Sequence, residues 1–135
     1  MKTARTRVQT SRRATLRLGG VLLALAMAAP LSLYAHHGWG GYLDQDFEVT
    51  GTVTAPVNLA GPHGALKIRA DGQIWDVVLA PPNRTERAGL TEDIIPMGAT
   101  VTAHGHRHRD PNRFEIKTER LTWNNRVFNV YPDRD

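Results

Sequence analysis

The segment Ala65–Leu79, with the sequence ALKIRADGQIWDVVL, decides the fold of this chain. Its first six residues alternate apolar and polar side chains, which is the pattern of a strand with one buried face. Asp71-Gly72 follows, a dipeptide that favours a two-residue hairpin turn. The remaining seven residues alternate again and place Trp75, Val77 and Leu79 on one face. The segment therefore predicts two antiparallel strands joined by a tight turn.

A similar alternation precedes this hairpin. Phe47–Val53 reads FEVTGTV and predicts a half-buried strand. Gly51 falls on its inner face, which indicates a bend or a close approach of another backbone. The following residues, 55–64, are rich in proline and glycine and predict a loop that carries His63.

The chain after the hairpin predicts one short helix and further strands. Asn83 and Glu86 have the spacing of a helix start, so we expect a helix over Arg84–Ala88 that ends at Gly89. Turn residues then separate alternating segments. The later predicted strands are residues 99–106, 114–123 and 126–131, with a tight turn at Asn124-Asn125 between the last two.

This order of elements predicts a mainly β domain. Three strands, a short helix and two or three more strands favour a small five- to six-stranded OB-like β-barrel, in which the helix lies between strands three and four. A generic β-sandwich is the alternative. The barrel is expected to span residues 47–131, after a flexible arm at 36–46 and before a short tail at 132–135.

Residues 1–35 have the features of an export signal peptide. Six basic residues precede the apolar run Gly19–Ala29, and Ala35 is a suitable residue before a cleavage point. The segment Ser11–Arg17 resembles a twin-arginine signal, although Thr15 stands where that signal usually has Phe, so the general secretory route stays open. An uncleaved anchor helix is the alternative. We expect a periplasmic or secreted protein with no membrane span after cleavage.

The net positive charge of the whole chain does not indicate a nucleic-acid partner, because it comes from the leader. The chain has 17 basic and 13 acidic residues, a net charge of +4, but six of the basic residues lie in the leader. The remainder carries 11 − 13 = −2, which argues against nucleic acid as a partner. The chain contains no cysteine, so a core alone must stabilise an exported domain of about 100 residues.

Several short motifs together resemble a known family. They are Ala35-His36-His37-Gly38 at the end of the leader, Gly51-Thr52-Val53, Pro62-His63, Asp71-Gly72 before Trp75, and Gly98 before Val101-Thr102. This combination looks like a family of small exported bacterial proteins of unknown function. The family's loop usually reads Asn-Pro-His, whereas this chain has Gly61-Pro62-His63. The resemblance implies export and a β-barrel, and it implies no activity.

Histidines are the candidate metal ligands. His104, His106 and His108 alternate along a predicted strand and share one face. Neighbouring positions on that face lie about 6.7 Å apart, so two of the three imidazoles can share one ion, and a site needs ligands from elsewhere. The full candidate set is His36, His37, His63, His104, His106 and His108.

An N-terminal histidine offers its own α-amine and imidazole as a chelate, and copper(II) favours such nitrogen sites. This requires cleavage directly before His36. Zinc is the other candidate ion for several imidazoles. The competing interpretation is that His104, His106 and His108 are surface residues, because Thr100 and Thr102 share their strand face and indicate that it is solvated.

No catalytic motif is present in the sequence, so we do not expect an enzyme. Asp76, Glu115, Lys117 and Glu119 lie on outward strand faces, where alternating charges are typical of cross-strand pairs. Trp75 and Phe114 are expected in the core. The sequence predicts a periplasmic binding module that holds copper(II) or zinc through histidines. The alternative is a non-catalytic barrel that binds a small ligand or a protein partner through its loops, with the histidines incidental.

Overall fold

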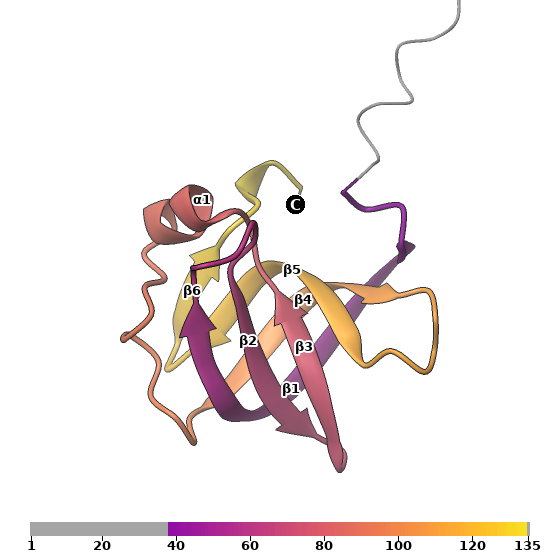
Figure 1. Cartoon of the computed structure of the whole chain (residues 1–135), viewed down its shortest axis with the longest axis horizontal. Coiled ribbons are helices and arrows are strands. Elements are labelled where there is room, and N and C mark those ends of the chain that lie inside the picture. Colours follow the sequence, from indigo (N-terminus) through magenta and orange to yellow (C-terminus); the bar gives the residue numbers. More distant parts are fainter. Residues whose placement is uncertain (1–37, 135) are drawn as a thin grey trace, which may run out of the picture. The chain divides into compact units, whose positions relative to one another are not determined.

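The computed structural model of the chain describes residues 38–134 (Figure 1). The expected leader, His36 and His37 lie outside the described residues. The six strands are β1 (Tyr42–Asn58), β2 (Ala65–Ala70), β3 (Gln73–Val78), β4 (Thr100–His108), β5 (Glu115–Trp123) and β6 (Arg126–Asn129). The helical elements are α1 (Pro82–Arg87), between β3 and β4, and a terminal 3₁₀ turn, η2 (Pro132–Arg134).

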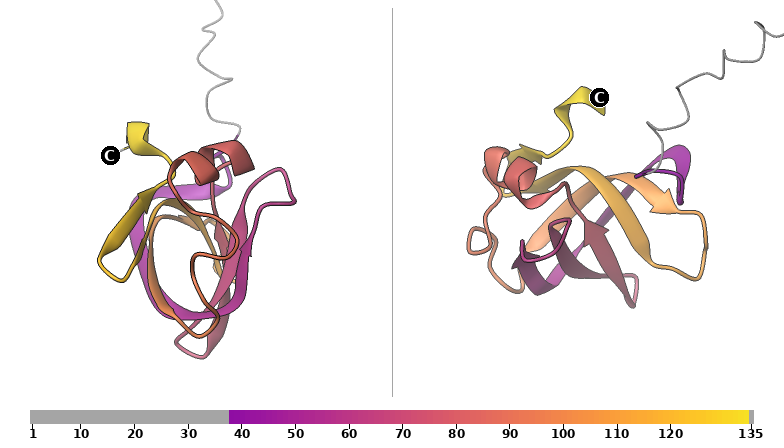
Figure 2. Two further views of the ribbon diagram at one scale, coloured as in Figure 1. Left: turned by 90° about the vertical axis from the view of Figure 1, so that its left-hand side faces the viewer. Right: turned by 45° about the horizontal axis from the view of Figure 1, so that its top comes forward.

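The strands form one sheet in the order β3-β2-β1-β4-β5-β6, with antiparallel neighbours. β3 also pairs with β5 in parallel, through Val77 opposite Ile116 and Val78 opposite Lys117. The sheet therefore curves until β3, at one edge, meets β5 near the other edge, as Figure 2 shows from two sides. The prediction of a mainly β domain with one short helix after the third strand is confirmed.

The inner face of the curved sheet holds the core. Trp75, which is 6% exposed, stacks on Phe47 and meets Phe114 edge-on, as the sequence predicted for a core aromatic. The guanidinium of Arg107 lies 5.2 Å from the Trp75 ring and covers this aromatic group. The fully buried side chains include Ile68, Val77, Leu79, Leu90, Ile95, Val101, Ile116, Leu121 and Phe128.

Two tight turns agree with the sequence. Asp71 and Gly72 have positive φ angles of 50° and 75°, and Asn124 and Asn125 have 50° and 62°. Positive φ at both central residues is what the favoured two-residue hairpin turn requires. Gly89 also has a positive φ, of 85°, directly after α1, where the sequence placed the end of the helix.

The structure differs from the sequence-based expectations at two element starts. β1 begins at Tyr42 rather than Phe47, and Tyr42 and Asp46, expected within the arm, pair with His108 and His106 of β4. The predicted helix cap at Asn83 is wrong. Helix α1 begins at Pro82 with Pro81 at the cap and no side-chain cap, because the fixed φ of proline suits a first helical position.

An irregularity in β5 positions the site described below. On β4, His104 pairs with Arg120 and Gly105 pairs with Thr118, so Glu119 has no partner of its own. This is a β-bulge, which re-aims the side chain of the extra residue. Gly105 lies at the same point, and a methyl group on it would overlap the carbonyl oxygen of Lys117. Glycine is therefore required where β4 and β5 approach so closely.

Candidate functional site

The histidine face of β4 is the candidate site. His104, His106 and His108 occupy alternate positions of β4, as the spacing predicted. The expectation that this face is solvated is wrong for His106, which is 8% exposed, while His104 and His108 are half-buried.

Trp39, which precedes β1, and Tyr42, the first residue of β1, cover this face. The ring of Trp39 lies 5.6 Å from that of His106 and 5.1 Å from that of Tyr131. Tyr42 packs edge-on against His108 at 5.5 Å. Trp39 and Tyr42 therefore hold the first described residues against the domain. The start of the described chain consequently lies on the histidine face.

Both ring nitrogens of His106 face hydrogen-bond acceptors. Nδ1 lies 2.9 Å from the carbonyl oxygen of Leu43, which can only accept, so Nδ1 carries a proton. Nε2 lies 3.1 Å from Oε1 of Glu119. An ionised carboxylate also only accepts, so this arrangement matches an imidazolium ring that donates to both neighbours. His106 thereby joins the start of β1 to β5.

Glu119 is a buried carboxylate, 3% exposed, at the bulge of β5. Besides His106, it accepts a hydrogen bond from Nε of Arg134 at 3.1 Å. Nδ1 of His104 lies 3.9 Å from its other oxygen. A buried charge needs such partners, because an unpaired carboxylate in the interior is strongly unfavourable.

His104 contributes a buried atom with unused bonding capacity. Its Nε2 lies 3.3 Å from a terminal amine of Arg120, which can only donate, so Nε2 acts as the acceptor. The proton of the neutral ring is then on Nδ1. That atom is buried and forms no hydrogen bond within the described part of the chain.

Lys117 was not identified as a site residue from the sequence. It is 3% exposed, with its Nζ 5.6 Å from the ring of Trp39 and 5.8 Å from that of Tyr131. Burial lowers its pKa, and the nearby Glu115 opposes this shift. The expectation of a wet, cross-strand charge pattern is wrong for Lys117 and Glu119. It is correct for Asp76, which forms a half-exposed ion pair with Lys67.

His63 lies in the β1–β2 loop and is connected electrostatically to this face. Its pKa is lowered, first by burial and then by the positive charge of Lys117. Lys117 is in turn the register partner of His106. His63 lines a separate cavity of about 570 Å³ together with Lys67 and Asp76.

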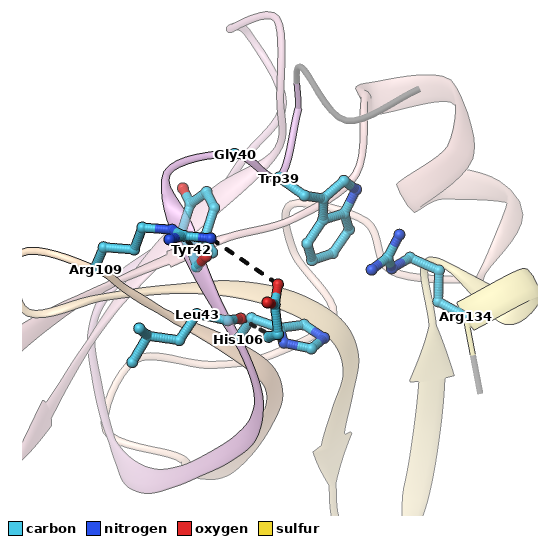
Figure 3. A pocket seen from close by; sticks show the side chains of 8 residues that line it. Trp39, Gly40, Tyr42, Leu43, His106, Arg109 and Arg134 are labelled. Carbon is cyan, nitrogen blue, oxygen red and sulfur yellow. Dashed lines mark hydrogen bonds and ion pairs between the residues drawn. The ribbon is translucent and has the colours of Figure 1, made fainter. Parts of the chain in front are cut away.

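A cavity of about 280 Å³ opens beside His106 (Figure 3). Arg109 lies on one side of it and Arg134 on the other, with the segment from Trp39 to Tyr42 between them. The remaining lining residues are Gly40, Leu43 and Asp44. The cavity therefore combines one histidine, two arginines and aromatic walls, and it lies where the described chain begins.

Within residues 38–134, no group of three or more His, Asp or Glu side chains could hold a metal ion. Of the six histidine candidates, His104, His106 and His108 share one face, His63 lies in a loop, and His36 and His37 are outside the described residues. In the same described part, no helix is long and apolar enough to cross a membrane.

Taken together, fold and site define a small six-stranded β domain with a buried histidine–glutamate pair under its N-terminal segment. The chain belongs to a family of unknown function, DUF6152, whose model matches residues 21–117. The resemblance found in the sequence is thus confirmed. No curated protein matches the chain.

Several solved structures are similar to part of this chain. The tRNAIle2 agmatidine synthetase TiaS, as a ZRD-deleted mutant in complex with agmatine, is 14% identical, with a TM-score of 0.46 over 58% of this chain and 21% of that protein. Its apo form is 16% identical, with a TM-score of 0.46 over 58% and 18%. A tRNA fluorescent labelling enzyme is 15% identical, with a TM-score of 0.45 over 58% and 18%. The chain matches about a fifth of the length of these proteins.

Proposed function

We propose that this protein is an exported, periplasmic binding module built on an OB-like β-barrel, and that it holds a divalent transition metal, copper(II) or zinc, through histidines. Two features support the barrel. The pairing of β3 with β5 joins the two sides of the curved sheet, and α1 lies between the third and fourth strands. Export is supported by the basic and apolar leader of the sequence.

The contact between Trp39 and His106 carries the metal proposal. Their rings lie 5.6 Å apart, and His37 precedes Trp39 by only two residues. Two extended residues span at most ~7 Å, so we propose that a chain that starts at His36 can bring its first ligands to the histidine face. Anchoring by Trp39 lowers the entropy cost of bringing these ligands to a common ion.

The hydrogen bonds of His106 support its proposed role as a metal ligand. Its Nδ1–H bond to the carbonyl of Leu43 fixes the ring, as hydrogen bonds behind ligating histidines commonly do. Nε2 is then the ligand atom, after it loses its proton. The buried carboxylate of Glu119, 3.1 Å from Nε2, keeps a negative charge beside the ion. The ligands in this proposal are His106 and the amine and imidazoles of His36 and His37.

The test uses the exported protein. The full chain is expressed with its leader, and mass spectrometry of the periplasmic product gives the mature N-terminus, which we expect at His36. Copper(II) is then titrated by calorimetry into this protein, into the same protein with one extra N-terminal glycine, and into His106→Gln. Since a lost ligand weakens a nitrogen site strongly, we expect each change to reduce affinity at least about tenfold.

His63→Gln is the matched control, because it removes an imidazole from the other cavity. It should leave the copper affinity unchanged. Equal affinity in all four proteins rejects the proposal, and a loss confined to His63→Gln moves the site to the Pro-His loop.

A second candidate has one observation in its favour. Both nitrogens of His106 are already engaged by Leu43 and Glu119, as in a purely structural histidine. The module would then be a non-catalytic barrel that binds a small ligand or a protein partner, with the histidines incidental. Unchanged copper affinity in His106→Gln is the result expected from this function.

A further inference from the structure

Two arginines from distant parts of the chain converge on the 280 Å³ cavity. Arg109 follows β4 directly, and Arg134 belongs to the terminal 3₁₀ turn η2. Figure 3 shows them reaching the cavity from opposite sides. Neither residue is used by the proposed metal site, so their placement calls for a separate account.

Both guanidinium groups are held in place by the protein. Nε of Arg109 donates to the carbonyl of Tyr42 at 2.8 Å, and Nε of Arg134 donates to Glu119 at 3.1 Å. The guanidinium of Arg134 also lies 4.0 Å from the ring centroid of Trp39. Anchoring through Nε fixes the plane of each group, and the two terminal amines form the donor pair that matches a carboxylate.

The charge of the cavity favours an anion. Arg109 and Arg134 contribute positive charge. The buried carboxylate of Glu119, which contacts both Arg134 and His106, offsets part of it and leaves Arg109 without a hydrogen-bonded anionic partner in the lining. The opposing carboxylate in the lining is Asp44, whose side chain is fully exposed and lies 4.0 Å from Arg109, beyond hydrogen-bond distance. An exposed carboxylate at that distance offsets little of the positive charge.

The walls of the cavity favour a ligand with an apolar body. Leu43 is 38% exposed and contributes apolar surface to the lining of the cavity. Trp39 and Tyr42 supply aromatic surface beside it. A volume of about 280 Å³ is at the lower end for small-molecule sites, which limits the ligand to a small one.

We infer that this cavity is a binding site for a small organic anion, with its carboxylate held by Arg109 and Arg134 and its apolar body against Leu43 and Trp39. The inference rests on the proposed function only in taking this cavity as the ligand site of a binding module. It does not require a metal ion.

Benzoate is a suitable probe, because it joins one carboxylate to one apolar ring. Its binding to the periplasmic protein is measured by calorimetry in the presence of EDTA, which separates this test from the metal proposal. Benzamide has the same shape without the charge, and phenyl phosphate tests the other anion chemistry. We expect saturable binding of benzoate and at least about tenfold weaker binding of benzamide, since hydrogen bonds to charged groups are the stronger ones. Tighter binding of phenyl phosphate than of benzoate would overturn the preference for a carboxylate.

Three variants locate the site. Arg109→Gln and Arg134→Gln should each weaken benzoate binding about tenfold. Arg69→Gln removes the same charge from the exposed face of β2 and should have no effect. Because Arg134 also pairs with Glu119, amide chemical shifts of the unaltered protein provide a second measurement, and benzoate should move those of residues 39–44 and of His106 and Arg109. Absence of saturable binding, equal binding of benzamide, or equal effects of the three substitutions would overturn the inference.

Discussion

Glu119 Oε1 lies 3.1 Å from His106 Nε2, and both residues are buried, with 3% and 8% of their surface exposed. This pair joins the bulge of β5 to the middle of β4. Through the second hydrogen bond of His106, to Leu43, it also holds the first residues of β1. The pair is therefore a structural connection as well as part of the candidate site.

Replacement of Glu119 by glutamine should destabilise the domain considerably. The change leaves the buried His106 and the partly exposed Arg134 without their common negative partner. Removing one member of a buried charge pair typically costs about 3–5 kcal/mol. Urea unfolding at neutral pH, followed by circular dichroism, measures this loss.

The control for this variant is Asp76→Asn, which breaks the ion pair with Lys67. That pair is about half exposed, and exposed pairs contribute at most about 1 kcal/mol. If both variants lose stability to a similar, small extent, Glu119 does not have the role assigned to it.

The strands and hairpin turns could be predicted because their signals are local. Asp71-Gly72 and Asn124-Asn125 adopt positive φ angles that few other residues tolerate, so a dipeptide determines each turn. Alternation likewise identified the buried face of β3, where Trp75 and Val77 lie in the core. Such features depend on near neighbours along the chain.

The burial of Lys117 and Glu119 could not be predicted in the same way. Alternation correctly placed both side chains on the outer face of β5, but it does not reveal whether another segment covers that face. The cover comes from Trp39, which is remote from β5 in the sequence, and from Tyr131 and Arg134, which follow the next strand, β6. The sequence offered one sign of this cover, which is the aromatic residue Trp39 between the glycines at positions 38, 40 and 41.

Stability should fall as the pH rises above about 10, and Tyr42 should account for part of this fall. Burial, followed by the hydrogen bond to Glu115, raises the pKa of Tyr42 well above its ordinary value. In the unfolded chain a tyrosine ionises near pH 10. Above that pH the unfolded state releases a proton that the folded state retains, so stability present below pH 10 is lost.

Tyr42→Phe should therefore flatten the fall. Urea midpoints measured between about pH 8 and pH 11 provide the comparison. The difference between the two curves isolates Tyr42 from Tyr131, whose pKa burial also raises, and from Lys117, whose lowered pKa acts in the opposite sense. Parallel curves for the two proteins would show that Tyr42 does not titrate differently on folding.

Trp39→Ala should release the N-terminal segment and weaken metal binding. The indole contacts His106 and Tyr131, and it lies beside the cations of Lys117 and Arg134. Without it, we expect faster hydrogen exchange of the Tyr42 amide, which donates to the Trp39 carbonyl at 2.9 Å. Copper(II) affinity should fall about tenfold, because the cost of ordering the arm is then added to binding. Trp39→Phe keeps an aromatic ring and should retain most of the affinity, so similar losses in both variants would contradict the anchoring role.

Gly105→Ala tests the close approach of β4 and β5 beside the site. The added methyl group would overlap the carbonyl oxygen of Lys117, and neither backbone can move without disturbing the bulge that positions Glu119. Overpacking of this kind costs about 3 kcal/mol, which thermal unfolding would detect as a clear drop in Tm. Gly38→Ala adds the same methyl group where no atom lies within 4 Å, and it should leave the Tm nearly unchanged. Equal stability of the two variants would mean that β4 and β5 can separate at this point, and the buried pairing of His106 with Glu119 would then not depend on glycine at position 105.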